Sequence, residues 1–230
     1  MTKTILKRIA LPRAWSVPRK SLNGSKRKFV SRPNSGKDFE TTVTINTLMK
    51  EVLSLARTKR EVKYILRTKE VLVNGNRIKD ERFPVGLFDI ITFPIIEKSY
   101  RMTLNEFGRI GIIEIDSKES TLVMKKVVGK SLVKGGKQQI NLFGSGNIIS
   151  GEKIAIGDVV IIENKKIKSV IRLEKGSKVL MTGGRHAGKI GTVKEIVDSK
   201  IFISVDGIDL ETLTKYAYVF ADSENVVTVR

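Results

Sequence analysis

A glycine-rich stretch near the end of the chain comes close to a phosphate-binding loop. Gly183, Gly188 and Lys189 have the spacing of the loop that cradles nucleotide phosphates in many NTPases. That loop needs Ser or Thr after the lysine to hold Mg²⁺, and it opens a helix. Here Ile190 follows the lysine, and residues 191–197 are rich in the β-branched side chains typical of a strand. The sequence therefore predicts a loop between two strands and no nucleotide hydrolysis.

Other side chains suited to covalent or metal chemistry are scarce. The chain has no Cys and one His, His186, which excludes disulfides, thiol nucleophiles and metal sites built from Cys or several His. No apolar run approaches the roughly 20 residues that span a bilayer, and the basic N-terminus lacks the apolar part of a secretory signal. We expect a cytoplasmic protein without metal, cofactor, small-molecule substrate or membrane contact, and we interpret His186 as an ordinary loop residue.

Positive charge is the dominant feature of the composition. The 230 residues include 43 Lys and Arg against 24 Asp and Glu, a net charge of +19, with enough apolar residues (40%) to form cores. Solubility alone needs a net charge of only about 2–8 in a small domain. More than half of the excess lies in residues 1–37, which carry 11 bases and no acid. A polyanionic partner is therefore the first hypothesis.

Residues 1–37 show no apolar periodicity and contain Pro12, Pro18 and Pro33, so we expect no regular element in them. A solvated tail is one interpretation. An arm that orders on a phosphate backbone is the other, and apolar residues between the cations, including the only Trp, favour an arm that docks or stacks. The predicted contacts of this arm are Lys7, Arg8, Arg13, Trp15, Arg19, Lys20, Lys26, Arg27, Lys28 and Arg32.

Two helices and a hairpin are predicted after the arm. Apolar residues recur at three- and four-residue steps over Thr44–Ala56, with Thr44 as N-cap. Thr58 and Glu61 form the pattern of a capping box in front of a second helix over Lys59–Arg67. Asn-Gly at 74–75, between two extended runs, predicts a tight β-hairpin.

Cations recur along one edge of the second predicted helix, at Lys59, Arg60, Lys63 and Arg67. By itself this row fits a solvated helix face as well as a binding face. However, residues 56–66 and 71–78 together resemble the alpha-L RNA-binding motif, a helix-and-hairpin module of ribosomal proteins and RNA-modifying enzymes. The resemblance implies that structured RNA is bound by Arg57, Lys59, Arg60, Lys63, Arg67 and Arg77, with the acidic Asp80, Glu81 and Asp89 on the side away from the RNA.

Residues 98–173 are predicted to be β-rich, with strands over 109–115, 121–128, 159–162 and 167–171. Their lysines, among them Lys118, Lys125, Lys126 and Lys130, form either a second phosphate-facing surface or ordinary surface charge.

The glycine-rich loop at residues 183–189 fits a different motif better than the phosphate-binding loop. Val179–Met181, followed by Gly184-x3-Gly188-x2-Gly191-x-Val193, resembles the KOW motif of translation and transcription proteins. The resemblance implies a small SH3-like barrel, with further strands near Lys200–Val205 and Val226–Val229. Arg185 and Lys189 are then the phosphate contacts expected on its loop.

Further stretches share their residue order with one family. They are Leu6–Ala10 with Pro12, Arg13 and Trp15, then Ser31–Gly36, Arg82–Ile91 and Met181–Gly184. These stretches resemble the small-subunit ribosomal protein S four family of the archaeal and eukaryotic type, with the weakest resemblance over 98–150. The sequence thus predicts a multidomain α+β protein with a basic extended arm (1–37), an alpha-L domain (38–97), a central β-rich domain (98–173) and a C-terminal KOW barrel (174–230).

The resemblance implies a structural constituent of the small ribosomal subunit that binds ribosomal RNA and neighbouring ribosomal proteins and catalyses no reaction. One alternative is an alpha-L-containing pseudouridine synthase, but its Arg-Leu-Asp run has only Arg172-Leu173-Glu174 as a counterpart, and 98–173 is too short for its catalytic domain. Another is a KOW transcription factor, which would account for 174–230 alone.

Overall fold

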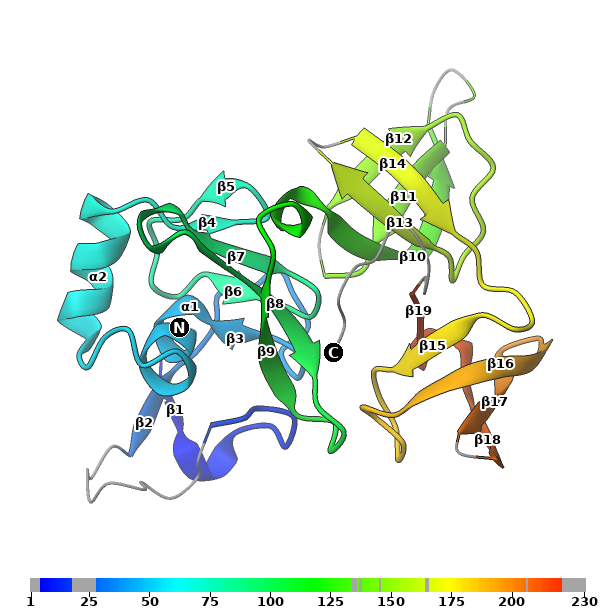
Figure 1. The fold of residues 1–230 in the computed structure, drawn as a ribbon, viewed down its shortest axis with the longest axis horizontal. Helices are drawn as coiled ribbons and strands as arrows, with labels where there is room; N and C mark the ends of the chain where they lie inside the picture. The colour runs from blue at the N-terminus through cyan, green and yellow to red at the C-terminus, as the bar shows by residue number, and fades with distance from the viewer. Residues whose placement is uncertain are drawn as a thin grey trace. The chain divides into compact units, whose positions relative to one another are not determined.

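The structure, a computed structural model, describes residues 5–17, 28–133, 136, 138–144, 146–163, 166–205 and 207–220, and it divides into two units (Figure 1). Unit 1 comprises residues 1–103 and 109–120, and unit 2 comprises 104–108 and 121–230. Strands dominate both units and helices are few, which confirms the predicted α+β class. The four predicted domains are a finer division and stay a prediction.

A five-stranded sheet with the order β5-β4-β7-β8-β9 forms the centre of unit 1. Its strands are β4 (Leu72–Val73), β5 (Asn76–Arg77), β7 (Ile90–Phe93), β8 (Lys98–Leu104) and β9 (Ile110–Ile115). Two short pairs accompany it, β1 (Ile5–Lys7) with β2 (Phe29–Ser31), and β3 (Val43–Thr44) with β6 (Pro84–Val85). The helices are α1 (Ile45–Thr47), which continues as a π-helical turn over Leu48–Val52, and α2 (Lys59–Thr68). Short 3-10 turns occupy Arg8–Ala10, Pro94–Ile96 and Glu119–Thr121.

The first predicted helix is shorter than expected. Thr44 caps it as predicted, since its side chain accepts a hydrogen bond from the Thr47 backbone N–H at 3.1 Å. The helix then widens into a π turn and ends near Val52 instead of Ala56. Ser54 has a φ of +52°, and the backbone N–H groups of Leu55 and Ala56 both donate to the Met49 carbonyl. A sharp reversal of the backbone therefore replaces the last predicted turn. Ile45, Leu48 and Met49 of the apolar stripe are buried, whereas Val52 and Leu55 are each 37% exposed.

The described parts of residues 1–37 contain regular structure, which corrects the expectation of none. β1 and β2 pair in antiparallel register from Ile5 opposite Ser31 to Lys7 opposite Phe29. Trp15 is only 4% exposed, its indole N–H donates to the Phe39 carbonyl, and its ring lies 5.7 Å from the Phe39 ring. This indole docks into the core of unit 1, so it offers no open face for a base to stack on.

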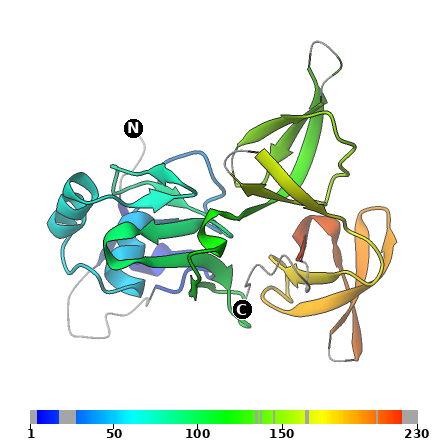
Figure 2. The same cartoon turned by 45° about the horizontal axis from the view of Figure 1, so that its top comes forward.

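Unit 2 contains two five-stranded sheets and a 3-10 turn at Thr214–Tyr216; Figure 2 shows that the second sheet is strongly curled. The first, in the order β12-β11-β10-β13-β14, consists of β10 (Val123–Leu132), β11 (Gln138–Leu142), β12 (Asn147–Ser150), β13 (Val159–Glu163) and β14 (Lys166–Ile171). The second, in the order β18-β17-β16-β15-β19, consists of β15 (Lys178–Met181), β16 (Ile190–Val197), β17 (Lys200–Val205), β18 (Ile208–Leu213) and β19 (Ala217–Val219). The strand predicted at Val226–Val229 lies outside the described residues.

Two lysines predicted on the surface of the middle region are buried. Lys125 and Lys126 are each 6% exposed, whereas Lys118 and Lys130 are exposed. The Lys126 ammonium donates to the carbonyls of Thr214 at 2.7 Å, Lys215 at 3.1 Å and Ala217 at 2.6 Å. Lys126 therefore connects β10 to the turn and the strand that close the second sheet, and it is not a phosphate-facing residue.

Candidate RNA interface

Helix α2 begins at a complete capping box, as predicted. The Thr58 hydroxyl accepts from the Glu61 backbone N–H at 3.2 Å, and the Glu61 carboxylate accepts from the Thr58 backbone N–H at 3.4 Å. The Arg57 N–H donates to the same carboxylate at 2.7 Å. That hydrogen bond, followed by the one from the Thr58 hydroxyl, lowers the pKa of Glu61 because both stabilise the charged form. The cap fixes where the helix starts and hence which side chains face outward.

The two faces of α2 differ in chemistry. Val62 and Leu66 are fully buried against the rest of unit 1. Lys59, Arg60 and Arg67 are exposed, and Lys63 is half-buried. Arg60, Lys63 and Arg67 are spaced i, i+3 and i+7, which places them on one side of the helix. Among the described residues, no acidic group pairs with Arg60 or Arg67. The predicted cationic row is therefore present as an outward-facing surface.

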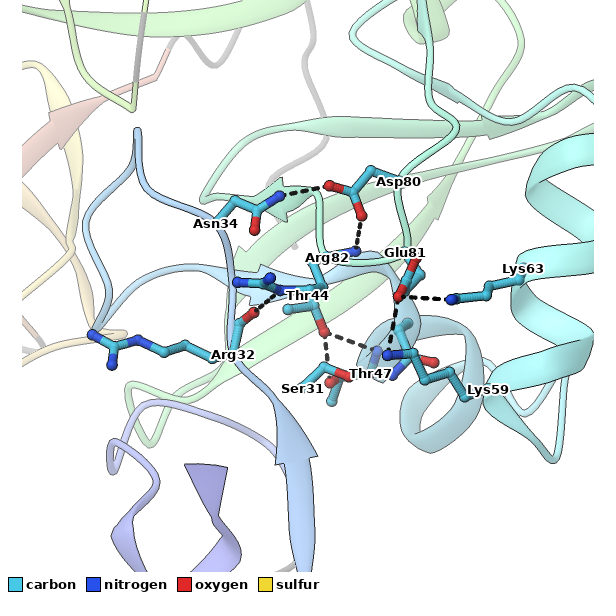
Figure 3. Close-up of polar contacts among 11 residues, drawn as sticks. Ser31, Arg32, Asn34, Thr44, Thr47, Lys59, Lys63, Asp80, Glu81 and Arg82 are labelled. Atoms are coloured by element: carbon cyan, nitrogen blue, oxygen red, sulfur yellow. Dashed lines mark hydrogen bonds and ion pairs between the residues drawn. The ribbon is translucent and has the colours of Figure 1, made fainter. Parts of the chain in front are cut away.

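Glu81 lies beside the basic face of α2 and not on the opposite side, where it was predicted. Its carboxylate lies 3.0 Å from the Lys59 amine and 3.5 Å from the Lys63 amine (Figure 3). Burial works to raise the pKa of Glu81, but the hydrogen bond from Lys59 and the two positive charges outweigh it, and the pKa is lowered. The expectation that Glu81 lies away from the basic face is wrong, and this acid holds two of the predicted contacts in place.

The hairpin brings one more cation to the helix. Asn74 and Gly75 have φ values of +50° and +76°, the conformation that a two-residue hairpin turn requires. Arg77 on β5 is exposed, and its guanidinium donates to the Arg67 carbonyl at the end of α2 at 3.5 Å. Arg57 is exposed at the other end of the helix, just before the cap. Five exposed bases and Lys63 thus lie along α2 and the adjoining hairpin.

A network of hydrogen bonds ties the segment after β2 to the residues that follow the hairpin (Figure 3). Asn34 donates to Asp80 at 2.6 Å, and the Arg82 backbone N–H donates to the same carboxylate at 2.9 Å. The Arg82 guanidinium donates to the Arg32 carbonyl at 3.3 Å. The Arg32 guanidinium lies 5.7 Å from the centre of the Phe39 ring. Arg32 is therefore anchored to unit 1 and does not belong to a loose arm.

The remaining N-terminal candidates divide into three groups. Lys7, Arg13 and Lys28 are exposed. Arg8 is 5% exposed and its guanidinium lies 2.5 Å from the Glu51 carboxylate, so this side chain serves the fold. Arg19, Lys20, Lys26 and Arg27 lie outside the described residues.

Unit 2 carries the last two candidates on the turn between β15 and β16. Arg185 and Lys189 are exposed there, and His186 is half-buried. Gly188 has a φ of +87°, and a Cβ at this position would meet the Asn105 carbonyl oxygen at 2.0 Å. Because the loop links two strands, the prediction that it does not open a helix is confirmed. The glycine allows close packing between two backbone segments and does not surround a phosphate.

Two further features are absent from the described ranges. No three acidic or histidine side chains gather there into a group that could hold a metal ion. No helix in those ranges combines the length and apolar character needed to cross a membrane.

Comparison with known protein families gives two matches. The model of Ribosomal family S4e matches residues 96–169, and that of the KOW motif matches residues 175–206. The first match covers the stretch where the sequence resemblance is weakest. The second covers the glycine loop and the strands on both sides of it.

Several archaeal proteins are similar along most of the chain. The small ribosomal subunit protein eS4 of Archaeoglobus fulgidus is 36% identical over 220 residues, covering 93% of this chain and 91% of that protein. The eS4 protein of Nanoarchaeum equitans is 38% identical over 200 residues, covering 85% and 83%. The crystal structure of 30S ribosomal protein S4e from Thermoplasma acidophilum shares the fold, with a TM-score of 0.68 and 24% identity over 81% of this chain and 97% of that one. By its sequence and its fold, this chain belongs to the eS4 family of small ribosomal subunit proteins.

Proposed function

We propose that the chain is a structural constituent of the small ribosomal subunit that binds and stabilises folded ribosomal RNA. The observation that carries this proposal is the outward cationic row of α2, joined to the hairpin through Arg77 and Arg67, on a member of the eS4 family. Helix α2, its capping box and the hairpin constitute the proposed alpha-L module. Neighbouring ribosomal proteins are the expected further partners, and the ribosome is the expected location.

The proposed contacts combine exposed cations of both units with the half-buried Lys63. They are Lys7, Arg13, Lys28, Arg57, Lys59, Arg60, Lys63, Arg67, Arg77, Arg185 and Lys189. Surface ion pairs such as those of Lys59 and Lys63 with Glu81 are worth roughly 0–1 kcal/mol, so phosphates can compete for these amines. Helical RNA is recognised mostly by its shape and backbone, which suits a row of cations along a helix.

The proposed role of unit 2 rests on the second sheet. Its strands β15 and β16 flank the KOW loop, and the Gly191 backbone packs tightly on β17, where a Cβ would meet the Ser204 carbonyl oxygen at 2.6 Å. We take this sheet to be the SH3-like barrel, which presents Arg185 and Lys189 to RNA.

No catalytic role is proposed for the chain. In the closest counterpart of the pseudouridine synthase motif, the side chains of Arg172 and Glu174 are 72% and 66% exposed and lie 4.0 Å apart. A carboxylate in so open a position has none of the enclosure that a catalytic acid uses to exclude water.

The proposal predicts a steep dependence of RNA affinity on salt. A surface that contacts about six to ten phosphates loses about 10³–10⁵-fold in affinity between 50 and 200 mM salt, because each contact releases condensed counterions. Filter binding of the purified protein to folded small-subunit ribosomal RNA measures this slope, with heparin as competitor and crosslinking in cells to identify the bound RNA. Equal affinity for heparin and for the folded RNA, or crosslinks to unrelated transcripts, would contradict the proposal.

A further inference from the structure

The KOW loop between β15 and β16 packs tightly against a second turn of unit 2. That turn, residues 104–108, follows β8 and belongs to the same unit as the loop. A Cβ on Gly188 would meet the Asn105 carbonyl oxygen at 2.0 Å and the Gly108 nitrogen at 2.7 Å. A Cβ on Gly108 would in turn meet the Ala187 side chain at 2.9 Å. Glycine at both positions therefore permits a backbone contact that larger residues would break.

The turn presents an aromatic side chain to water. Phe107 is 84% exposed. Asn105 closes the turn twice, because its carbonyl accepts from the Gly108 backbone N–H at 2.9 Å and its side-chain oxygen accepts from the Phe107 backbone N–H at 3.2 Å. The backbone that carries the ring is thus held in one conformation, so little order is lost when a partner binds the ring.

The loop on the other side of this contact carries two positive charges. Arg185 and Lys189 are exposed there, and neither pairs with an acid among the described residues. Lys189 directly follows Gly188, and chain steps of about 3.8 Å then place its Cα within about 10 Å of the Phe107 Cα. The Lys189 carbonyl accepts from the Met181 N–H at 3.0 Å, so this lysine starts from a fixed backbone position.

An exposed ring close to cations is the combination with which proteins bind unpaired nucleotides. The ring stacks on a base, and the cations hold the backbone phosphates. The turn and the loop together contain one acid, Glu106, against the bases Arg185 and Lys189, so their combined surface attracts anions. An apolar segment of a neighbouring protein would cover Phe107 but leave both cations without a partner. The charges therefore favour RNA as the occupant.

We propose that the turn at 104–108 and the KOW loop form one joint site for an unstacked nucleotide of ribosomal RNA. The base stacks on Phe107, and Lys189, with its charge on a flexible four-carbon stem, holds an adjoining phosphate. Arg185 adds a second phosphate contact. Such nucleotides occur in loops and bulges, where bases are splayed out of the helix. This inference rests on the proposed RNA-binding function and adds to it a contact with a base.

Phe107→Ala in the full-length protein should weaken binding to folded small-subunit ribosomal RNA by about 5- to 150-fold, the range for losing one stacked base. The slope of log K against log salt should stay unchanged, because Phe107 carries no charge. A fully paired RNA duplex offers no unstacked base, so this variant should bind it as the wild type does. Ile208→Ala removes an apolar side chain that is 64% exposed on β18 and should bind both RNAs normally. Filter binding measures all of these affinities.

Two further substitutions at the same position test stacking directly. Phe107→Trp retains an aromatic ring and should bind like the wild type. A stacked base quenches indole emission, so RNA should quench the added tryptophan, whereas the only native one, Trp15, is 4% exposed and gives a constant background. Phe107→Leu keeps an apolar side chain without a π face and should lose affinity as Phe107→Ala does. Circular dichroism verifies each fold.

A double-mutant cycle tests whether the turn and the loop hold the same nucleotide. Lys189→Ala should lower the salt slope by about one. Combined with Phe107→Ala, it should cost less affinity than the product of the two single losses, because the first change already releases the nucleotide. Phe107→Ala combined with Arg67→Ala, on α2 of unit 1, should instead give that product within about twofold.

Four results would each overturn the joint site. They are an unchanged affinity in Phe107→Ala, an equal loss on the paired duplex, an unquenched Phe107→Trp, and a simple product for Phe107→Ala with Lys189→Ala. Each of them leaves the proposed function standing while the wild type binds folded ribosomal RNA tightly. Absence of that binding in the wild type would overturn both.

Discussion

Lys126→Met should lower the free energy of unfolding of unit 2 by about 3 kcal/mol. This is the largest effect on stability that we expect from a single substitution. Met matches the length of the lysine stem but donates no hydrogen bond, so the carbonyls of Thr214, Lys215 and Ala217 lose a shared donor. Hydrogen bonds from a charged group contribute about 1.5–3 kcal/mol each, and part of that is offset by the desolvation of the ammonium.

Hydrogen exchange measures this effect where it should appear. The amides of β15 and β19 should exchange about 100-fold faster in Lys126→Met, since 1.4 kcal/mol corresponds to a factor of ten. Unit 1 should exchange at the wild-type rate, because all three carbonyls belong to unit 2. Lys130→Met, on the same strand with its side chain in water, should change stability by less than about 0.5 kcal/mol.

The pH dependence of the free energy of unfolding, compared between the wild type and Lys126→Met, gives an independent readout. Burial lowers the pKa of Lys126 to about 8 from its ordinary 10.5. Between these two values the unfolded chain binds more protons than the folded one, so the free energy of unfolding rises with pH. From pH 8 to 10 the stability of the wild type relative to Lys126→Met should increase by about 2 kcal/mol. A difference that stays constant or shrinks over this interval would show that the amine is not held in the buried position.

Local elements were predictable because their signals are local. The Thr44 cap, the Thr58–Glu61 capping box and the Asn74–Gly75 turn each depend on side chains within four residues of one another. The same holds for the alternating strands of 98–173 and for the loop before Ile190. These features are decided by backbone preference and neighbouring hydrogen bonds, which a sequence displays directly.

Residues whose role depends on distant partners could not be placed in this way. Trp15 and Arg8 stand in a segment without periodicity, and only the contacts with Phe39 and Glu51 bring them into the core. In the sequence Lys126 resembles the exposed Lys130 of the same strand, and its three carbonyl partners lie about 90 residues further along the chain. Net charge marked the N-terminal segment as an arm, although several of its apolar residues are part of the core of unit 1.

The candidate site was predictable as a set of residue types and only partly as an arrangement. Spacing along α2 sufficed to align Arg60, Lys63 and Arg67, because helical periodicity is fixed. Glu81 was missed, since its place between Lys59 and Lys63 follows from the path of the chain after the hairpin.

Removing both unpaired arginines of α2 should have the largest effect on RNA binding. Arg60→Ala combined with Arg67→Ala should weaken binding to folded small-subunit ribosomal RNA by about 10²–10⁴-fold, since each contact between a charged group and a phosphate contributes about 1.5–3 kcal/mol. The slope of log K against log salt should fall by about two, one for each lost phosphate contact. Because neither side chain pairs with an acid among the described residues, the fold should survive, as circular dichroism would show.

A matched control separates this face from charge in general. Lys194→Ala with Lys200→Ala removes the same two positive charges from β16 and β17 of unit 2, where the amines pair with Asp209 and Glu211. If RNA responded only to the net charge of +19, both double variants would lose affinity equally. A loss confined to the α2 variant requires phosphates to lie along that helix, because screening at about 8–10 Å in ordinary salt leaves distant surface charges little influence. Retention of full affinity by Arg60→Ala with Arg67→Ala would remove α2 from the interface and, with it, the proposed alpha-L module.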